Sequence, residues 1–415
     1  MPSLQSCRLR KRMGGARLLL VSTCLVMLMM PFRGDTQPRP RKKLIEFGWD
    51  MPSPEFVRDN IRVMEKRPFD GIVLRTGGFN HAFDTNTWKA QEIQADLDVL
   101  AAIQWGRFKD SFLVLYAANR WDMEFYNDDH WRAIAHNIRM VSKLVKAGRC
   151  VGVCFDTEPY GKNPWAYPGN YGDKPFEEIQ AQVRKRGAEF MTALQYYVPD
   201  IKVLSTFQYA MFEPLVDIPD RAARDKRHLE LTDPKHYALL PAFFNGMLNA
   251  AQPGVRLIDG NENSYWYESP NSFYWGYHLM KQRCQTMVPV ELRSKFIAQV
   301  QAGMALYVDE LFGRRAGQKT TGNFLSPAEQ LTFFEHNTYF ALTTTDEYVW
   351  LYSERMNWWK EVAPGAADYG EEGGRPEGLE AAVVSARDKY DKGLPFGVDI
   401  RDMIAQARKE RRINQ

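Results

Sequence analysis

Two acidic residues, Asp156 and Glu158, directly follow the apolar run Val151–Phe155. In a strand, residues two apart point to the same side, so both carboxyl groups would face one site. Two close carboxylates repel each other, which raises the pKa of one, and a carboxylic acid that stays protonated near neutrality can act as a general acid. Glycoside hydrolysis needs such an acid together with a second carboxylate, or with the substrate's own acetamido group.

Three other glutamates are candidates for the second carboxylate. Glu262 is the preferred one, because the segment DGNENSYWY places acids, amides and aromatic rings together, as a sugar-binding site would. Glu310 is a candidate by analogy with retaining barrel enzymes, whose nucleophile follows strand seven. Glu354 is a third choice. The sequence contains no distances, so a retaining and an inverting mechanism both stay open.

The segment VGVCFDTEPYG resembles the fourth strand of chitinase-type barrels, in which an Asp-x-Glu at the strand end precedes Tyr-Pro. The resemblance implies that Glu158 is the acid and that Asp156 orients a substrate acetamido group. The chain has Cys154 where that family has another aspartate, and the order after Glu158 is Pro-Tyr rather than Tyr-Pro. More broadly, the layout of the chain resembles secreted bacterial TIM-barrel glycoside hydrolases.

Polar and aromatic residues also follow the other predicted strands. Indole rings offer an apolar face to the C–H face of a sugar, while carboxylates and amides bind its hydroxyl groups. Each acid could instead cap a helix or pair with an arginine, since carboxylates are rarely buried without a partner. The predicted substrate-binding residues are Trp49, Asp50, Arg75, Asn119, Gln208, Asp259, Asn261, Trp266 and Trp358.

Eight short apolar runs alternate with amphipathic segments of helical length along the chain. Short runs of this kind are typical of buried parallel strands. The predicted strands are Leu44–Gly48, Gly71–Arg75, Phe112–Ala117, Val151–Phe155, Val203–Phe207, Val255–Ile258, Met304–Val308 and Tyr348–Tyr352. The predicted helices are Pro54–Lys66, Trp88–Gln104, Asp129–Ala147, Pro175–Tyr197, His236–Ala251, Pro289–Ala302, Ser326–Thr343 and Glu377–Tyr390.

This alternation predicts an α/β fold, a single (β/α)8 TIM barrel over residues 44–415. The segment His236–Ala251 is apolar enough for a strand, but its period and length favour a helix. A doubly wound sheet is the alternative fold, and it usually has a glycine fingerprint after its first strand, where this chain has FGWDMPSP. In a TIM barrel the chemistry lies at the carboxyl ends of the strands, where the acids and tryptophans fall.

Residues 1–36 form a segment of another kind. Basic residues precede the 13-residue apolar run Leu18–Met30, which suits a signal peptide and is short for a membrane span. We expect a cleaved signal peptide or an uncleaved N-terminal anchor, then a linker over residues 37–43, and a secreted or periplasmic protein. Membrane contact is expected only through such an anchor.

The charge of the chain argues against a nucleic-acid partner. Six basic residues and one acidic residue lie in the first 36 positions, while the whole chain has a net charge of only +3, so the remainder is slightly acidic. A basic surface for nucleic acid is therefore not indicated. The expected partner is a carbohydrate substrate.

Cys150, Cys154 and Cys284 are the cysteines beyond the N-terminal segment, and their odd number and spacing predict buried free thiols with no zinc site. No cofactor is expected. The sequence has no GxSxG, HExxH or phosphate-binding loop motif. Two alternatives remain. One is a non-catalytic glycan-binding barrel. The other is a polysaccharide lyase or metal-dependent carbohydrate enzyme, with a cation held by Asp156, Glu158, Asp259 and Glu262.

Overall fold

The computed structural model describes residues 41–117, 123–231, 237–315, 320–360 and 374–412. The predicted signal or anchor segment and most of the predicted linker lie outside these residues. No helix within the described ranges is long and apolar enough to cross a membrane.

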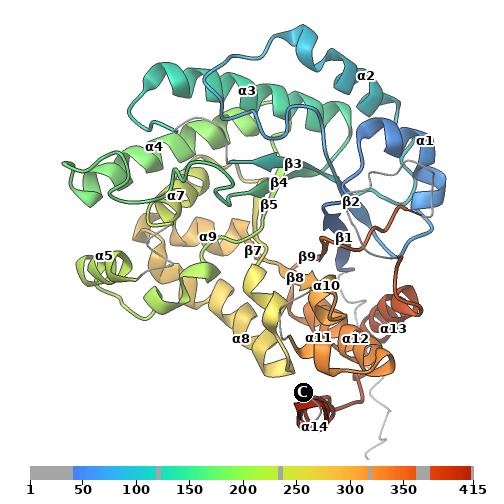
Figure 1. The fold of residues 1–415 in the computed structure, drawn as a ribbon. Helices are drawn as coiled ribbons and strands as arrows, with labels where there is room; N and C mark the ends of the chain where they lie inside the picture. Colours follow the sequence, from blue (N-terminus) through green and yellow to red (C-terminus); the bar gives the residue numbers. More distant parts are fainter. Residues whose placement is uncertain (1–40, 118–122, 232–236, 316–319, 361–373, 413–415) are drawn as a thin grey trace, which may run out of the picture. The chain divides into compact units, whose positions relative to one another are not determined.

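The centre of the fold is one parallel sheet (Figure 1). Its strand order is β7-β6-β5-β4-β3-β2-β1-β9-β8, and every pairing is parallel. The strands are β1 (Lys43–Gly48), β2 (Gly71–Leu74), β3 (Phe112–Tyr116), β4 (Gly152–Asp156), β5 (Lys202–Ser205), β6 (Arg256–Asp259), β7 (Val300–Ala302), β8 (Met304–Tyr307) and β9 (Tyr348–Ser353). The eight predicted strands are all present.

The two ends of the sheet belong to one stretch of chain. Only Gly303 separates β7, which pairs with β6, from β8, which pairs with β9. The Gly303 amide donates to the Asp259 carbonyl at 2.7 Å. A Cβ atom at position 303 would lie 2.9 Å from that same oxygen, so this close approach requires glycine. The sheet is therefore an eight-stranded barrel whose seventh strand is split, and the predicted TIM barrel is confirmed.

Side chains alternate between the inside and the outside of the barrel, as the two-residue period of a strand requires. The residues that pack inside are Ile45, Phe47, Val73, Phe112, Val114, Cys154, Leu204, Ile258, Ala305, Tyr307, Tyr348 and Trp350. Their neighbours in sequence, such as Leu44, Val153 and Leu351, belong to a larger apolar cluster between the strands and the helices. Each central strand is buried on both faces, which explains its nearly continuous apolar sequence.

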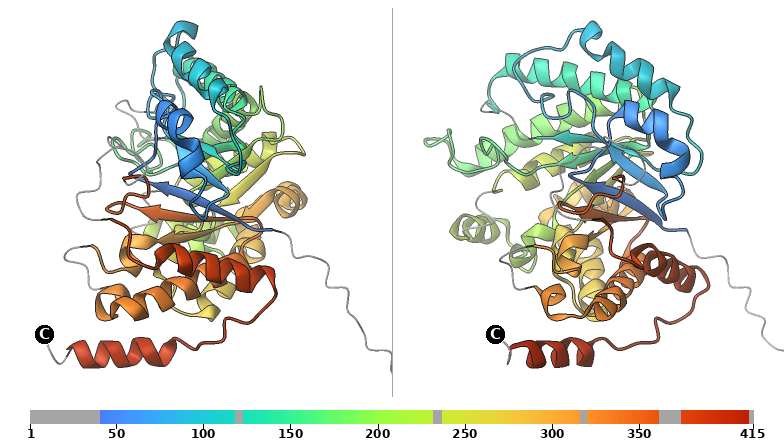
Figure 2. Two further views of the ribbon diagram at one scale, coloured as in Figure 1. Left: turned by 90° about the vertical axis from the view of Figure 1, so that its right-hand side faces the viewer. Right: turned by 45° about the vertical axis from the view of Figure 1, so that its right-hand side comes forward.

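The helices surround the barrel (Figure 1). They are α1 (Pro54–Met64), α2 (Gln94–Ala102), α3 (Asp128–Ala147), α4 (Phe176–Leu194), α5 (Arg221–Glu230), α7 (Leu240–Ala250), α8 (Pro270–Lys281), α9 (Arg293–Gln299), α10 (Val308–Leu311), α11 (Thr321–Phe324), α12 (Pro327–Thr344), α13 (Leu379–Asp391) and α14 (Arg401–Arg412). Short 3₁₀ helices are η1 (Ala90–Ile93), η2 (Ala210–Leu215), η3 (Glu262–Trp266), η4 (Arg283–Met287) and η5 (Val290–Leu292). Figure 2 shows α13 beside α12 and α14 farther out on the same side.

The predicted helices are present, with shifted ends. The segment that could have been a strand, His236–Ala251, contains α7. The helix predicted over Pro289–Ala302 is divided into η5, α9 and β7. Ser53 and Ser326 cap their helices by accepting the amides of Phe56 at 3.3 Å and Glu329 at 3.4 Å. Helices α5, α8, α10, α11 and α14 were not predicted.

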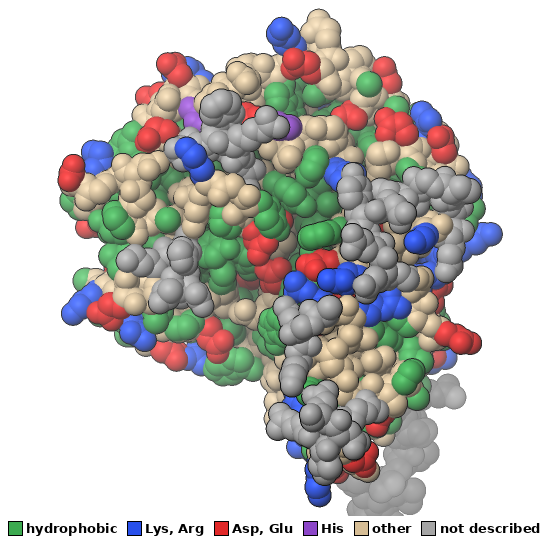
Figure 3. Space-filling view, viewed as in Figure 1, with side chains coloured by type: hydrophobic (Ala, Val, Ile, Leu, Met, Phe, Trp, Pro, Cys, Tyr) green, Lys and Arg blue, Asp and Glu red, His purple; other side chains and the backbone are tan. Residues whose placement is uncertain are grey.

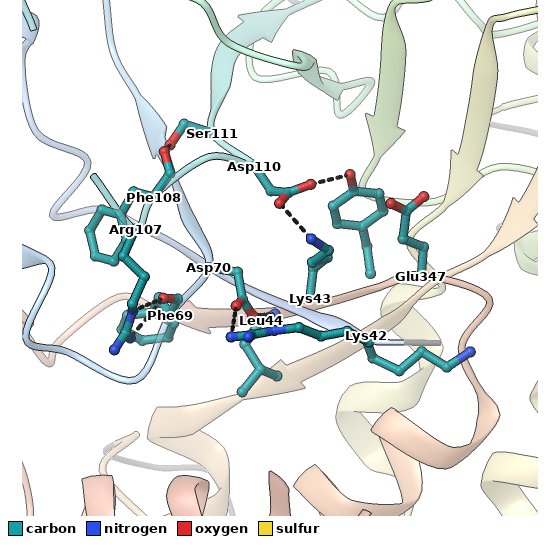
Figure 4. A network of polar contacts seen from close by, with 12 residues as sticks. Lys42, Lys43, Leu44, Phe69, Asp70, Arg107, Phe108, Asp110, Ser111 and Glu347 are labelled. Carbon is teal, nitrogen blue, oxygen red and sulfur yellow. Dashed lines mark hydrogen bonds and ion pairs between the residues drawn. The ribbon is translucent and has the colours of Figure 1, made fainter. Parts of the chain in front are cut away.

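A network of ion pairs and hydrogen bonds closes the amino end of the barrel (Figure 4). Asp110, which precedes β3, accepts from the Lys43 ammonium at 2.9 Å and from the Tyr348 hydroxyl at 2.8 Å. Asp70, which precedes β2, accepts from Arg387 of α13 at 2.5 Å and from the Leu44 amide at 2.9 Å. These contacts join β1 and β9 to the starts of β2 and β3.

The three cysteines of the barrel, Cys150, Cys154 and Cys284, are buried and free. The prediction of buried free thiols is confirmed. Burial raises the pKa of all three thiols, and it brings that of Cys150 to about 12.

Candidate active site at the barrel mouth

A hollow at the carboxyl end of the barrel contains Asp156, Glu158 and Glu262, and we call it the mouth hollow. Its lining residues are Phe47, Gly48, Trp49, Tyr116, Asp156, Glu158, Tyr160, Thr206, Glu262, Tyr265, Trp350 and Tyr352. Figure 3 shows acidic side chains near the centre of this face, beside hydrophobic ones. The structure thus brings together the Asp-x-Glu pair and the preferred second carboxylate.

Asp156 is the last residue of β4, and its side chain follows Cys154 on the inner side of the barrel. The Glu158 amide donates to Asp156 Oδ1 at 2.9 Å, which fixes the turn between the two acids. The Tyr160 hydroxyl lies 2.9 Å from Asp156 Oδ2 and 2.5 Å from Glu158 Oε2. A hydroxyl has one proton, so it can bridge two carboxyl groups fully only when one of them holds a proton too.

Glu262 reaches the mouth hollow from the segment after β6. Asn261 precedes it with φ 49° and ψ 61°, a left-handed conformation that asparagine tolerates better than most residues. The Glu262 amide donates to the Thr206 carbonyl at 3.2 Å. This sharp turn ends β6 and starts η3, which places the glutamate among the residues that follow β4 and β5.

The environment raises the pKa values of two of these acids. Burial, and then the charge of Glu158, raise the pKa of Asp156 to about 7 despite its hydrogen bonds from the Glu158 amide and Tyr160. Burial, followed by the charges of Glu158 and Asp156, raises the pKa of Glu262 to about 8. Glu262 therefore holds a proton at neutral pH, which is the state that a general acid requires.

Aromatic side chains form the walls of the mouth hollow. Trp49 after β1 is 53% exposed and Tyr160 is 63% exposed, so both rings are accessible to a ligand. Tyr265 and Tyr352 are stacked, with centroids 5.8 Å apart and 18° between their planes. The sequence predicted Trp49, and Tyr265 lies in the segment DGNENSYWY that was predicted to bind sugar, but Tyr116, Tyr160 and Tyr352 were not predicted. For Tyr352 the available signal was the alternation Tyr348, Trp350, Tyr352 in β9, which places all three rings inside.

Trp266 lies beside a second cavity of about 180 Å³. Its ring is 56% exposed, and its neighbour Tyr265 lines both this cavity and the mouth hollow. Trp49 and Trp266 are thus exposed rings at two hollows that have Tyr265 in common.

Glu310 and Glu354 are placed differently from Glu262. Neither lines the mouth hollow, and Arg315 lies between them, 3.8 Å from Glu310 and 3.6 Å from Glu354. Glu310 is only 3% exposed in α10 and borders the second cavity, while Glu354 accepts from the Tyr352 hydroxyl at 3.3 Å. Neither glutamate lines the hollow that contains Asp156 and Glu158, but Glu354 contacts Tyr352, which does.

Asp259, Gln208 and Asn261 have structural roles, contrary to the expectation that they bind substrate. Asp259 accepts the main-chain amides of Gln208 at 3.0 Å, Ala210 at 2.9 Å and Asn261 at 3.1 Å. Gln208 is fully buried and donates to Ser205 and to the Ile258 carbonyl. Asn261 is 1% exposed, and its side-chain amide donates to the Tyr267 hydroxyl. A ligand cannot reach these groups without rearranging the loop.

The other predicted substrate-binding residues that the structure describes, Asp50, Arg75 and Trp358, do not line the mouth hollow. Trp358 was wrongly predicted, because its ring is fully buried and packs edge-on against Phe69 with centroids 4.7 Å apart. Asp50 is 4% exposed and accepts the Trp358 amide at 2.7 Å, so it is structural too. Arg75 lies 5.7 Å from the centre of the Phe79 ring and does not line the mouth hollow. Asn119 lies outside the described residues.

Within the described part of the chain, no group of three or more His, Cys, Asp or Glu side chains is arranged to hold a metal ion. Of the four predicted cation ligands, Asp259 already accepts main-chain amides with both oxygens.

Comparisons with known proteins show similarity only at the level of structure. No protein-family model matches the chain, and no curated protein matches its sequence. One similar structure is GH5_18 from Streptomyces cattleya in complex with GlcNAc, with 13% identity and a TM-score of 0.44 over 83% of this chain and 76% of that chain. Another is a GH18 chitinase from Pseudoalteromonas aurantia, with 9% identity and a TM-score of 0.36 over 83% of this chain and 99% of that chain.

Proposed function

We propose that this chain is a glycoside hydrolase that uses Glu262 and Glu158 as its catalytic carboxyl groups. One observation supports this most strongly. Asp156, Glu158 and Glu262 line a single hollow at the barrel mouth, and two of them have pKa values raised to about 7 and about 8. A buried carboxyl group that keeps its proton near neutrality can act as the acid, and a second carboxyl group in the same hollow can act as nucleophile or base, as glycoside hydrolysis requires.

Glu262 is the general acid in this proposal. It is protonated at neutral pH and can protonate the oxygen of the leaving sugar. Glu158 is the carboxylate partner, either as nucleophile or as the base that activates water. Asp156 is a positioning residue, because it holds the Glu158 amide and shares Tyr160 with the Glu158 side chain. These roles differ from those that the chitinase-type resemblance implies, in which Glu158 is the acid.

The proposed substrate is an oligosaccharide or polysaccharide. Trp49 and Tyr160 are exposed rings beside the acids, and Trp266 is an exposed ring at the second cavity, so each offers a surface on which a sugar ring can stack. Such a substrate fits a secreted or periplasmic enzyme, the location that the N-terminal segment predicts. No cofactor is required for this chemistry.

The dependence of rate on the leaving group tests the two roles. Aryl glycosides with a good leaving group, such as 2,4-dinitrophenol, need little acid assistance, whereas phenol needs much more. We expect Glu262→Gln to slow phenyl glycosides by about 10²–10⁴-fold and dinitrophenyl glycosides far less. Glu158→Gln should slow both. Glu213→Gln, an exposed carboxylate bound to Trp275 outside the mouth hollow, is the matched control.

Three outcomes would contradict the proposal in different ways. A Glu158→Gln variant that is impaired only on poor leaving groups would make Glu158 the acid and restore the chitinase-type roles. Full activity in both variants would exclude these carboxyl groups from catalysis. Saturable glycan binding with no product from the unmodified protein would favour the non-catalytic glycan-binding barrel.

A further inference from the structure

A separate cavity of about 550 Å³ lies outside the barrel and is lined by residues of α4, α5, α7 and the η4–η5–α9 segment. Figure 1 shows where α4, α5, α7 and α9 lie. None of the mouth acids lines it. Its volume is within the range of small-molecule sites. Charged side chains from α4, α5 and the start of α9 meet apolar ones from α7 and the η4–η5 segment in its wall.

Four arginines line this cavity, and two of them are paired with carboxylates. Arg184 lies 3.0 Å from Glu291. Arg221 lies 3.4 Å from Glu177 and 3.6 Å from Asp225. These pairs use all three carboxylates of the cavity wall.

The other two, Arg224 of α5 and Arg293 of α9, have no carboxylate within ion-pair distance among the described residues. Arg224 donates to the Ile218 carbonyl at 3.0 Å. Arg293 donates through Nε to the carbonyls of Gln285 at 3.1 Å and Val288 at 3.4 Å. Each guanidinium has five N–H groups, so several on each side chain remain for a ligand.

Arg224 lies close enough to Arg293 for their positive charges to interact. Desolvation lowers the pKa of Arg224, and the charges of Arg221 and Arg293 also lower it, whereas the charges of Asp225 and Asp220 raise it. An anion between Arg224 and Arg293 would relieve this repulsion. It would also gain charge-assisted hydrogen bonds, for which the planar guanidinium is suited.

The other polar side chains in the wall already have partners. Asn245 accepts from the Tyr209 hydroxyl at 3.0 Å and donates to the Met287 carbonyl at 3.2 Å. Thr286 donates to the Val216 carbonyl at 2.7 Å. The rest of the wall includes the apolar side chains of Pro241, Met287 and Val288. The cavity therefore offers spare donors at its arginines and an apolar surface beside them.

We infer that this cavity binds a small organic anion, with its carboxylate, sulfonate or phosphate group between Arg224 and Arg293 and an apolar body against Pro241, Met287 and Val288. The inference does not depend on the proposed glycosidase activity, because the two sites share no lining residue.

A calorimetric titration with 4-phenylbutyrate tests it, with 4-phenylbutyramide as the neutral ligand of the same shape. We expect the carboxylate to bind at least tenfold more tightly than the amide. Arg224→Met with Arg293→Met should abolish this preference, while Arg224→Lys with Arg293→Lys should retain part of it. Lys226→Met, an exposed charge on α5 outside the cavity wall, should bind as the unmodified protein does.

Equal affinity for the carboxylate and the amide would overturn the inference, as would an unchanged preference in the double Met variant. If inorganic phosphate binds as tightly as 4-phenylbutyrate, the proposed contact of an apolar ligand body with Pro241, Met287 and Val288 would be wrong. Thermal unfolding of each variant controls for folding, because both arginines also bond main-chain carbonyls. Glycoside hydrolysis should stay unchanged throughout.

Discussion

The acids of the barrel mouth differ in what surrounds their carboxyl groups. Asp259 is satisfied by main-chain amides, whereas Asp156 and Glu262 are buried beside other carboxylates. The two-residue period of a strand predicted the pairing of Asp156 with Glu158. The sequence predicted that both Asp259 and Glu262 contact the substrate, because the amides that bind Asp259 belong to a turn that only the fold creates. The sequence also predicted both Trp49 and Trp358 as substrate-binding residues, because only the fold shows that the first ring is exposed and the second is buried.

The pH dependence of kcat/KM follows from the raised pKa of Glu262. In the proposed mechanism the acid form of Glu262 is the active one, so activity should be lost as the pH rises through about 8. Asp156→Asn removes a nearby negative charge that favours the protonated form, so it should move this alkaline limb to lower pH. A pH–rate profile measured for both proteins checks this. An alkaline limb that stays in place in Asp156→Asn would show that Glu262 is not the titrating acid.

Trp49 and Trp358 should respond oppositely to replacement by alanine. Trp49 is 53% exposed beside the acids, so its loss should raise KM severalfold and leave the melting temperature nearly unchanged. Trp358 is fully buried, so its loss should lower the free energy of unfolding by about 3–5 kcal/mol. Steady-state kinetics and urea unfolding of both variants test the contrast. An unchanged KM in Trp49→Ala would remove this ring from substrate binding.

At the scale of elements, the sequence predicted all eight barrel strands because short apolar runs bounded by polar loops are distinctive. The division of the seventh strand at Gly303 was not predictable, since the need for glycine arises from the neighbouring Asp259 carbonyl. Helix α8 was missed because its sequence, PNSFYWGYHLMK, follows the predicted site segment and mixes aromatic with polar residues. Helix α5 was missed because it is strongly charged and presents little apolar surface.

The amino end of the barrel should determine stability without affecting catalysis. Asp110 joins the starts of β1, β3 and β9 and is 7% exposed, so Asp110→Ala removes hydrogen bonds from Lys43 and Tyr348. We expect the free energy of unfolding to fall by about 2 kcal/mol or more, with kcat and KM unchanged below the melting temperature. Asp59→Ala, at an exposed ion pair with Arg58, is the control and should change neither. A large change in kcat in Asp110→Ala would contradict the view that the amino end of the barrel affects stability and not catalysis.

At the scale of the whole molecule, the two ends of the barrel have different compositions. One end is closed by paired charges around Asp70 and Asp110, and the other opens on carboxyl groups and exposed aromatic rings. This division is the general one for TIM barrels, in which the loops after the strands contain the reacting groups. The fold, and the end of the barrel at which Asp156, Glu158 and Glu262 lie, were therefore predictable together, whereas the partners of each acid depended on loop geometry.

Release of reducing ends from a panel of natural glycans tests the central claim most directly. The unmodified protein and the Glu158→Gln and Glu262→Gln variants would be compared at pH 7, with circular dichroism to show that all three are folded. The account predicts that the unmodified protein releases reducing sugar from at least one glycan, and that each variant is slower by at least about a hundredfold. Undiminished release by either folded variant would contradict it.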